Sequence, residues 1–383
     1  MSLDKLQQSL NKKYSKGKER NVIVKGGDIE EVQVICSSGT LSLDVAIGIG
    51  GLPRGRIMEY YGPPSGGKTL LSILSIISAQ KEGKNCAFVD IENSFDIKWF
   101  KSLGGTEDNL LYVKPSNAVE AYEIVEDLVT SNQIDLIVVD SVAAMATEAE
   151  QEGGYGDAHM AQLARLMSQG LKKLNSIMIE NDKCSIIFIN QVRSSMRNFQ
   201  GREITTTSGG KSLEFYSSVR LEVKRGEIIG DKDDPEGFRT KIIVKKNKVG
   251  PPMRKVEVSL YIGKNGKYGA DVNEEIIDVA IGLNVIEKMS KDKTTKELIA
   301  DENGAWYRIE EGVEFYGRPK LIEYIQANPE SVEKLKTTVF AFMSHKIKPS
   351  EGSFDDKMDK KERKKRGVKE SDTKGESEVS EDM

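Results

Sequence analysis

The sequence predicts an α/β fold whose core is a mostly parallel, doubly wound sheet. Four continuous apolar runs indicate buried strands, because strands covered on both faces lack an alternation of polar residues. These runs span residues 57–61, 85–90, 136–140 and 185–190. Helix-length segments, such as residues 118–130 and 159–180, separate them. This alternation is typical of crossover connections, which place helices on both faces of a parallel sheet.

Smaller elements flank this core. Leucines at positions 3, 6 and 10 have helical spacing and predict a short helical arm over residues 3–14. Apolar segments at 219–223, 240–244 and 256–261 follow one another closely and predict antiparallel strands. Helical patterns at 321–327 and 332–343 mark a smaller C-terminal region, which we expect to form a small α+β domain.

We therefore expect four parts, which span residues 1–31, 32–268, 269–348 and 349–383. The first part holds the helical arm and a linker, and the second is the α/β core. The last part is almost wholly charged or polar, basic around 360–366 and acidic from Glu370 onward. Such a composition cannot bury enough apolar surface to fold, so we expect a disordered tail.

Composition narrows the class of protein. The net charge of −4 neither indicates nor excludes nucleic-acid binding, because basic residues can gather on one face. Three widely spaced cysteines and only two histidines argue against a disulfide framework and against zinc. No N-terminal apolar leader and no membrane-length apolar run is present, so we expect a soluble, cytoplasmic protein without a membrane partner.

Residues 62–69 match the phosphate-loop pattern G-x-x-x-x-G-K-[ST]. The expected nucleotide-binding residues are Gly62, Pro63, Pro64, Ser65, Gly66, Gly67, Lys68 and Thr69. Glycines let several backbone N–H groups point at one phosphate chain, the lysine reaches the β- and γ-phosphates, and the threonine hydroxyl binds Mg²⁺. A strand-like segment precedes the loop and a helix-like run follows it, which places the phosphates at a helix N-terminus. The sequence therefore predicts binding of a nucleoside triphosphate.

Three polar residues stand at the ends of predicted strands, where doubly wound sheets present their ligand sites. Asp140 closes the strand 136–140 and is placed to act on Mg²⁺ through water. Glu92 follows the second strand and could orient or deprotonate the water that attacks the γ-phosphate. Gln191 follows the fourth strand, and its amide could sense the γ-phosphate by hydrogen bonding.

Together these residues resemble the RecA recombinase family, in bacterial or phage-encoded form, over residues 3–343. Beyond the phosphate loop, the resemblance rests on an ordered set of motifs. They are SLD at 42–44, GLPRGR at 51–56, AFVDIE at 87–92, IVVDSVAA at 137–144, GDAHM at 156–160, FINQVR at 188–193, TTT at 205–207, GG at 209–210 and KNK at 246–248. A lone phosphate loop occurs in many families, whereas this ordered set is highly specific.

The resemblance implies a RecA-type P-loop ATPase core, an arm used for polymerisation, and a DNA-dependent ATPase activity that requires ATP and Mg²⁺. It implies helical filaments on single-stranded DNA and strand exchange with homologous duplex DNA, in recombinational repair and the SOS response to DNA damage. Single-strand-binding or mediator proteins are possible further partners. A hexameric helicase with the same core, or a regulatory relative that binds ATP or DNA, are the alternatives.

The resemblance also implies roles for individual residues. Glu92 becomes the catalytic carboxylate and Gln191 the switch between nucleotide and DNA. Asp96 and Trp99 are expected against the adenine, with tryptophan where the family usually has tyrosine. Lys246 and Lys248 are expected to complete the ATP site of the neighbouring protomer, in the manner of arginine fingers.

Two loops are expected to face DNA. The first, at about 148–165, carries Met160 as an apolar wedge and Arg165 as a phosphate contact. The second runs from 193 to 210 and suits a surface that follows the DNA backbone. Its expected DNA-binding residues are Arg193, Arg197, Phe199, Arg202, Thr206, Gly209 and Gly210.

Three positions depart from the family pattern. Gly66 replaces a serine but supplies the same backbone N–H. Ser208 lengthens the second loop by one residue. Glu214 stands where a lysine is common near the subunit interface, and we expect it to weaken the coupling of neighbouring ATP sites unless Lys211 takes over.

Overall fold

The computed structural model describes residues 2–16, 21–145, 160–197, 203–292, 294–295 and 297–346. Within these ranges the backbone alone is described at 160–161, 193–197, 203–206 and 343–346. Phe199, Arg202 and the charged tail lie outside the described residues.

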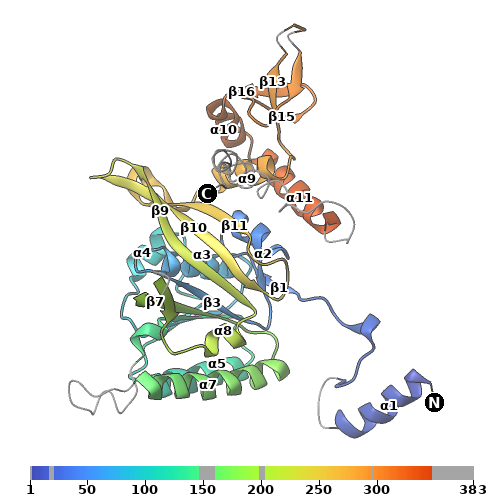
Figure 1. Cartoon of the computed structure of the whole chain (residues 1–383), viewed down its shortest axis with the longest axis vertical. Coiled ribbons are helices and arrows are strands. Elements are labelled where there is room, and N and C mark those ends of the chain that lie inside the picture. The colour runs from blue at the N-terminus through green and yellow to red at the C-terminus, as the bar shows by residue number, and fades with distance from the viewer. Residues whose placement is uncertain are drawn as a thin grey trace, which may run out of the picture. The chain divides into compact units, whose positions relative to one another are not determined.

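The central sheet is mixed, as the sequence predicts (Figure 1). Across the sheet the order is β12 (Tyr268–Ala270), β11 (Lys255–Ile262), β10 (Pro235–Asn247), β9 (Val219–Gly230), β3 (Ile57–Gly62), β7 (Ser185–Arg197), β6 (Leu136–Asp140), β4 (Cys86–Asp90) and β5 (Leu110–Val113). The strands from β9 to β5 pair in parallel, while β9, β10, β11 and β12 pair with one another antiparallel. Both strand groups therefore follow the prediction.

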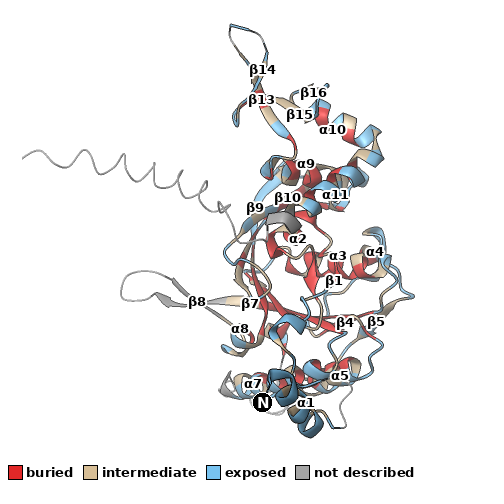
Figure 2. Cartoon of the chain, turned by 90° about the vertical axis from the view of Figure 1, so that its right-hand side faces the viewer, coloured by how far each residue is buried: buried red, intermediate tan, exposed pale blue. Residues whose placement is uncertain are grey.

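Helices cover both faces of the parallel strands (Figures 1 and 2). On one face lie α2 (Leu41–Ile47), α3 (Lys68–Lys81) and α4 (Ile97–Ser102), which share an apolar core with Met58 and Tyr60. On the other lie α5 (Ala118–Thr130), α7 (Met160–Glu180) and α8 (Ser212–Tyr216), packed on Ile57 and Phe188. Since side chains alternate along a strand, one sheet supplies both cores, and the fold is doubly wound. All three cysteines are buried and free.

Flanking elements match the predicted parts in kind. The arm helix α1 (Leu3–Tyr14) is tied to the following segment, because Asn11 and Gln7 both donate to the carbonyl of Ile23. Short strands β1 (Val34–Cys36) and β2 (Leu52–Pro53) pair before the core. C-terminal elements are α9 (Val272–Gly282), β13 (Glu287–Lys291), β14 (Leu298–Ala300), β15 (Trp306–Glu310), β16 (Val313–Tyr316), α10 (Arg318–Ala327) and α11 (Pro329–Lys346).

The four strands β13 to β16 form a separate antiparallel sheet. Contacts divide the chain into residues 1–339 and 340–383, and of the second unit only the end of α11 is described. The boundaries at 31, 268 and 348 stay predictions. In the described part of the chain, no helix is both long and apolar enough to cross a membrane.

The prediction of a loop over residues 193–210 was wrong for most of that range. Strand β7 continues to Arg197 and pairs antiparallel with β8 (Glu203–Thr207), so the segment is largely a hairpin. The β-branched residues at 204–207 favour this extended backbone, and Gly209 and Gly210 lie beyond it. The first predicted loop ends earlier than expected, because α7 begins at Met160.

Glu275 joins α9 to the start of α2. Its buried carboxylate accepts hydrogen bonds from the N–H groups of Leu41 (3.1 Å) and Ser42 (3.4 Å). Burial raises the pKa of Glu275 to about 7, although these hydrogen bonds oppose the shift. Asp44 in α2 is also buried and has its pKa raised to about 7.

These shifts predict a pH-dependent stability. A carboxyl whose pKa is higher in the folded state binds its proton more tightly there, so stability is greatest below the unfolded pKa and falls as pH rises toward 7. We expect Glu275→Gln to remove its share of the decline between about pH 4.5 and 7, up to about 3 kcal/mol, in denaturant unfolding. The exposed Glu323→Gln is the control and should keep the wild-type slope. An unchanged slope in Glu275→Gln would contradict this assignment.

Candidate functional site

The candidate site lies where the parallel strands end. Strand register pairs Gly62 of β3 with Gln191 of β7, and Asp90 of β4 with Asp140 of β6. Because these strands run in the same direction, the residues that follow them emerge at one edge of the sheet. The predicted phosphate loop, both acids and the glutamine therefore meet there.

Lys68 sits at the first position of α3 and is buried. Its Nζ donates hydrogen bonds to the carbonyls of Pro63 (2.8 Å) and Gly62 (3.2 Å) of its own loop. Burial lowers the pKa of Lys68, while the charges of Asp140 and Glu92 oppose that shift. The ammonium is thus held over the phosphate loop by groups that phosphate oxygens can replace.

Thr69 and Asp140 are in contact. The Thr69 hydroxyl donates to Asp140 Oδ2 at 2.7 Å, and Asp140 Oδ1 is buried without a hydrogen-bond partner within the described ranges. Burial raises the pKa of Asp140 to about 6, with the hydrogen bond from Thr69 opposing. A hydroxyl oxygen beside a buried carboxylate oxygen fits a hard cation such as Mg²⁺, which prefers oxygen ligands. These two residues fit the ion that the sequence predicted.

Glu92 and Gln191 also meet, although 98 residues separate them in sequence. Gln191 Nε2 donates to Glu92 Oε1 at 3.3 Å, and the Ser141 hydroxyl donates to Glu92 Oε2 at 2.9 Å. The backbone N–H of Glu92 donates to the carbonyl of Asp140 at 3.1 Å, which fixes the acid beside β6. The expected catalytic carboxylate is therefore oriented by the expected switch residue and by Ser141, which the sequence reasoning did not identify.

Asp96 and Trp99 belong to α4, which follows Glu92 in the chain. Asp96 is the N-cap of that helix and accepts from the N–H groups of Lys98 (2.7 Å) and Trp99 (3.2 Å). The ring of Trp99 lies 5.7 Å from that of Tyr268, at an interplanar angle of 58°. The sequence reasoning did not place Tyr268 beside Trp99, because no local pattern links β12 to α4.

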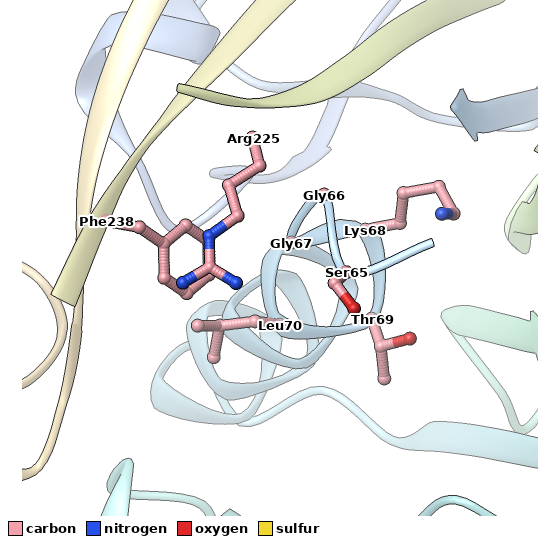
Figure 3. Close-up of a pocket in the computed structure, with 8 residues that line it drawn as sticks. All are labelled: Ser65, Gly66, Gly67, Lys68, Thr69, Leu70, Arg225 and Phe238. Carbon is pink, nitrogen blue, oxygen red and sulfur yellow. The ribbon is translucent and has the colours of Figure 1, made fainter. Parts of the chain in front are cut away.

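A cavity of about 270 Å³ lies against the phosphate loop (Figure 3). It is lined by Ser65, Gly66, Gly67, Lys68, Thr69, Leu70, Arg225 and Phe238. The guanidinium of Arg225 lies over the Phe238 ring at 4.7 Å, on the side of the loop away from Lys68 and Thr69. Arg225 and Phe238 were not predicted, since they come from β9 and β10 and meet only through the register of those strands.

Lys246 and Lys248 lie at the end of β10. Lys246 Nζ donates to the carbonyls of Glu214 and Phe215 in α8, the second at 3.0 Å. Burial lowers the pKa of Lys246, and the neighbouring Lys248 lowers it further. The Glu214 carboxylate lies 3.5 Å from Arg220 Nη1 of the same chain, whereas Lys211, the expected compensating residue, is exposed.

The expected DNA-binding residues fall on two elements. Arg165 is exposed in the second turn of α7, and only the backbone of Met160 is described. Arg193 and Arg197 lie in β7 and Thr206 lies in β8, at positions where only the backbone is described. Gly209 and Gly210 follow β8 with φ of +75° and +77°, a conformation that glycine adopts without strain. Phe199 and Arg202 lie outside the described residues.

The fold and this site define a P-loop nucleotide-binding protein with a carboxylate–amide pair beside the phosphate loop. Comparisons with known proteins show which family of P-loop proteins this chain resembles. A family model described as the RecA N-terminal domain matches residues 2–266. Proteins named Protein RecA are similar over most of their length: that of Halalkalibacterium halodurans is 40% identical over 88% of this chain and 90% of its own. That of Acinetobacter baylyi is 39% identical over 84% and 86%, respectively. A crystal structure of the RadB recombinase, 22% identical, covers 58% of this chain and 95% of its own with a TM-score of 0.44.

The chain belongs to the RecA family. The family model covers more than half of the chain, and the two relatives are 40% and 39% identical over 88% and 84% of it. The resemblance inferred from the motifs is confirmed, and the helicase and regulatory alternatives are not favoured.

Gly62 provides a test of the loop geometry. A Cβ at this position would lie 1.9 Å from the carbonyl oxygen of Val223 in β9, and two backbone segments cannot separate without moving a strand. We expect Gly62→Ala to weaken ATP binding at least tenfold and to lower the unfolding temperature by several degrees. Gly282→Ala is the matched control, because nothing lies within 4 Å of its Cβ. Wild-type ATP affinity in Gly62→Ala, measured by titration of a fluorescent analogue, would refute this account of the loop.

Proposed function

We propose that this protein is an ATP-dependent DNA recombinase, which assembles into helical filaments on single-stranded DNA and exchanges strands with homologous duplex. The observation that carries this proposal is the contact of Gln191 with Glu92 beside the phosphate loop. The same glutamine directly precedes the part of β7 that pairs with β8, where the expected DNA contacts lie. One residue thus belongs to both the nucleotide site and the DNA-facing element.

The reaction proposed is DNA-dependent hydrolysis of ATP to ADP and phosphate. Lys68 and the N–H groups of the loop bind the phosphates, and Thr69 and Asp140 would hold Mg²⁺, which neutralises charge on the β- and γ-oxygens. Glu92 is the general base or orienting group for the attacking water. Ser141 and Gln191 keep its carboxylate aimed at that position.

Further partners follow from the family. ATP is proposed to lie between neighbouring protomers, with Lys246 and Lys248 contributing to the next site. Adenine is proposed against Trp99, with Asp96 nearby. DNA is proposed to contact Met160, Arg165 and the β7–β8 hairpin with its flanking glycines. Single-strand-binding or mediator proteins and a cytoplasmic location complete the proposal.

The central prediction is stimulation of ATPase activity by DNA. Phosphate release should rise at least tenfold when a single-stranded oligonucleotide is added with Mg²⁺. Lys68→Ala should reduce release to background and abolish strand exchange, because the ammonium that contacts the phosphates is lost. Lys81→Ala, an exposed lysine in the last turn of the same helix, should behave as wild type.

Electron microscopy provides the second readout of that experiment. With DNA and a slowly hydrolysed ATP analogue, helical filaments are expected. Closed rings would favour a helicase, and a protein that neither hydrolyses ATP faster with DNA nor assembles on it would refute the proposal.

Glu92→Gln separates binding from hydrolysis. Glutamine keeps the size of the side chain but cannot accept a proton, so we expect retained ATP binding and filament formation with hydrolysis slowed by about 10²- to 10⁴-fold. Glu123→Gln, an exposed acid on α5, is the control. Steady-state hydrolysis at the wild-type rate would remove Glu92 from the catalytic role.

A further inference from the structure

Three polar side chains interrupt the apolar face of the sheet that α5, α7 and α8 cover. Glu59 and Asn190 are fully buried and Arg220 is nearly so. The strand order β9–β3–β7, with Glu59 beside Arg220 and Tyr61 beside Asn190, places all of them on the same face. This cluster lies next to the candidate site, but its residues belong neither to the phosphate loop nor to the expected DNA contacts.

Asn190 is the centre of the cluster. Its Nδ2 donates to Glu59 Oε1 at 3.0 Å and to the carbonyl of Ser208 at 3.1 Å. Its Oδ1 accepts from the backbone N–H of Gln191 at 2.9 Å. Ser208 directly follows β8, so a single carboxamide joins both ends of the β7–β8 hairpin and fixes the residue that carries the switch amide.

The contacts continue in both directions from Asn190. Toward the nucleotide, Gln191 contacts Glu92. Toward α8, Glu59 Oε2 accepts from Arg220 Nε at 2.5 Å, and Arg220 reaches the Glu214 carboxylate at 3.5 Å. The guanidinium also lies over the Tyr61 ring at 4.6 Å, which limits it to one orientation.

We infer that Asn190 is a positioning residue, which couples the state of the β7–β8 hairpin to the Glu92–Gln191 pair, and that Glu59, Arg220 and Glu214 hold it in place. This inference rests on the proposed function and names how one of its sites is regulated. When the hairpin moves on DNA, Ser208 and Gln191 move together through Asn190, and the carboxylate of Glu92 is re-aimed.

A purely packing role does not account for these residues. Removing a charged pair from water is costly, and an apolar side chain of similar volume usually packs as well or better. The cluster therefore serves orientation, since a buried carboxylate, guanidinium and carboxamide accept only one mutual arrangement. Glu214 also serves orientation. Its carboxylate is the last member of this chain of contacts and lies beside Arg220, where a lysine would repel the guanidinium.

The test is the ratio of ATP hydrolysis with single-stranded DNA to hydrolysis without it. We expect Asn190→Ala to lower this ratio at least tenfold, while the affinity for a fluorescent ATP analogue without DNA stays within about threefold of wild type. Ser185→Ala is the matched control: it removes a buried hydrogen bond, to the Pro53 carbonyl at 2.9 Å, from the opposite end of β7. It should lower thermal stability but keep the ratio.

Outcomes for Asn190→Ala are distinct. A folded variant with the wild-type ratio overturns the inference, and so does a parallel loss of ATP affinity, which indicates a merely structural role. If the wild-type enzyme itself is not stimulated by DNA, the proposed function fails, and the inference with it.

Glu214→Gln decides the case if Asn190→Ala does not fold. Glu214 is half exposed, so its replacement leaves the core intact. We expect its ratio to fall about two- to fivefold, less than for Asn190→Ala, because the 3.5 Å contact lies at the outer end of the series. Where both variants fold, the double variant should be no worse than Asn190→Ala alone. If Asn190→Ala does not fold, an unchanged ratio in Glu214→Gln overturns the inference. Where both variants fold, fully additive losses in the double variant refute the role of Glu214.

Discussion

The site depends on the register of four parallel strands. β3, β7, β6 and β4 are paired residue by residue, so their parallel pairing ends along one edge of the sheet, where β7 alone continues and pairs with β8. A shift of β7 by one residue would turn Gln191 to the opposite face and remove its contact with Glu92. The apolar residues Ile187 and Phe188 prevent that shift, because each is buried in a different core. Packing in the middle of the strands thus fixes the chemistry at their ends.

Local patterns in the sequence were sufficient for much of the fold. Helix α5 begins and ends where it was predicted, because Asn117 caps it by accepting from the N–H of Glu120 and its apolar residues keep helical spacing. The phosphate loop was identified for the same reason: its requirements lie within eight consecutive residues. Ser141, by contrast, contributes through a contact with Glu92 across two strands. No local pattern marks such a contact, since it depends on which strands become neighbours.

The errors and omissions have a common physical cause. The glycines and the length of the segment suggested a loop at 193–210. In the structure, residues Glu203–Thr207 pair with β7 and are extended. Pairing with a neighbouring strand therefore outweighs the local composition. Arg225 and Phe238 were missed because the ladder of β9 and β10 shifts register between Phe238 and Thr240. That irregularity brings an arginine over an aromatic ring beside the phosphate loop, and an alternating pattern cannot predict it.

Glu214 shows why the effect of a charge depends on its partner. From sequence, an acid in place of a lysine suggested weaker coupling between neighbouring ATP sites. In the structure its carboxylate faces Arg220, while its carbonyl accepts from Lys246. For Lys246 to contact a neighbouring ATP as proposed, it must exchange these carbonyls for phosphate oxygens, which form stronger, charge-assisted hydrogen bonds. That exchange would release α8 at the point where Arg220 holds Glu214. The acid therefore connects the proposed subunit contact with the buried cluster around Asn190, a connection that lysine at this position could not make.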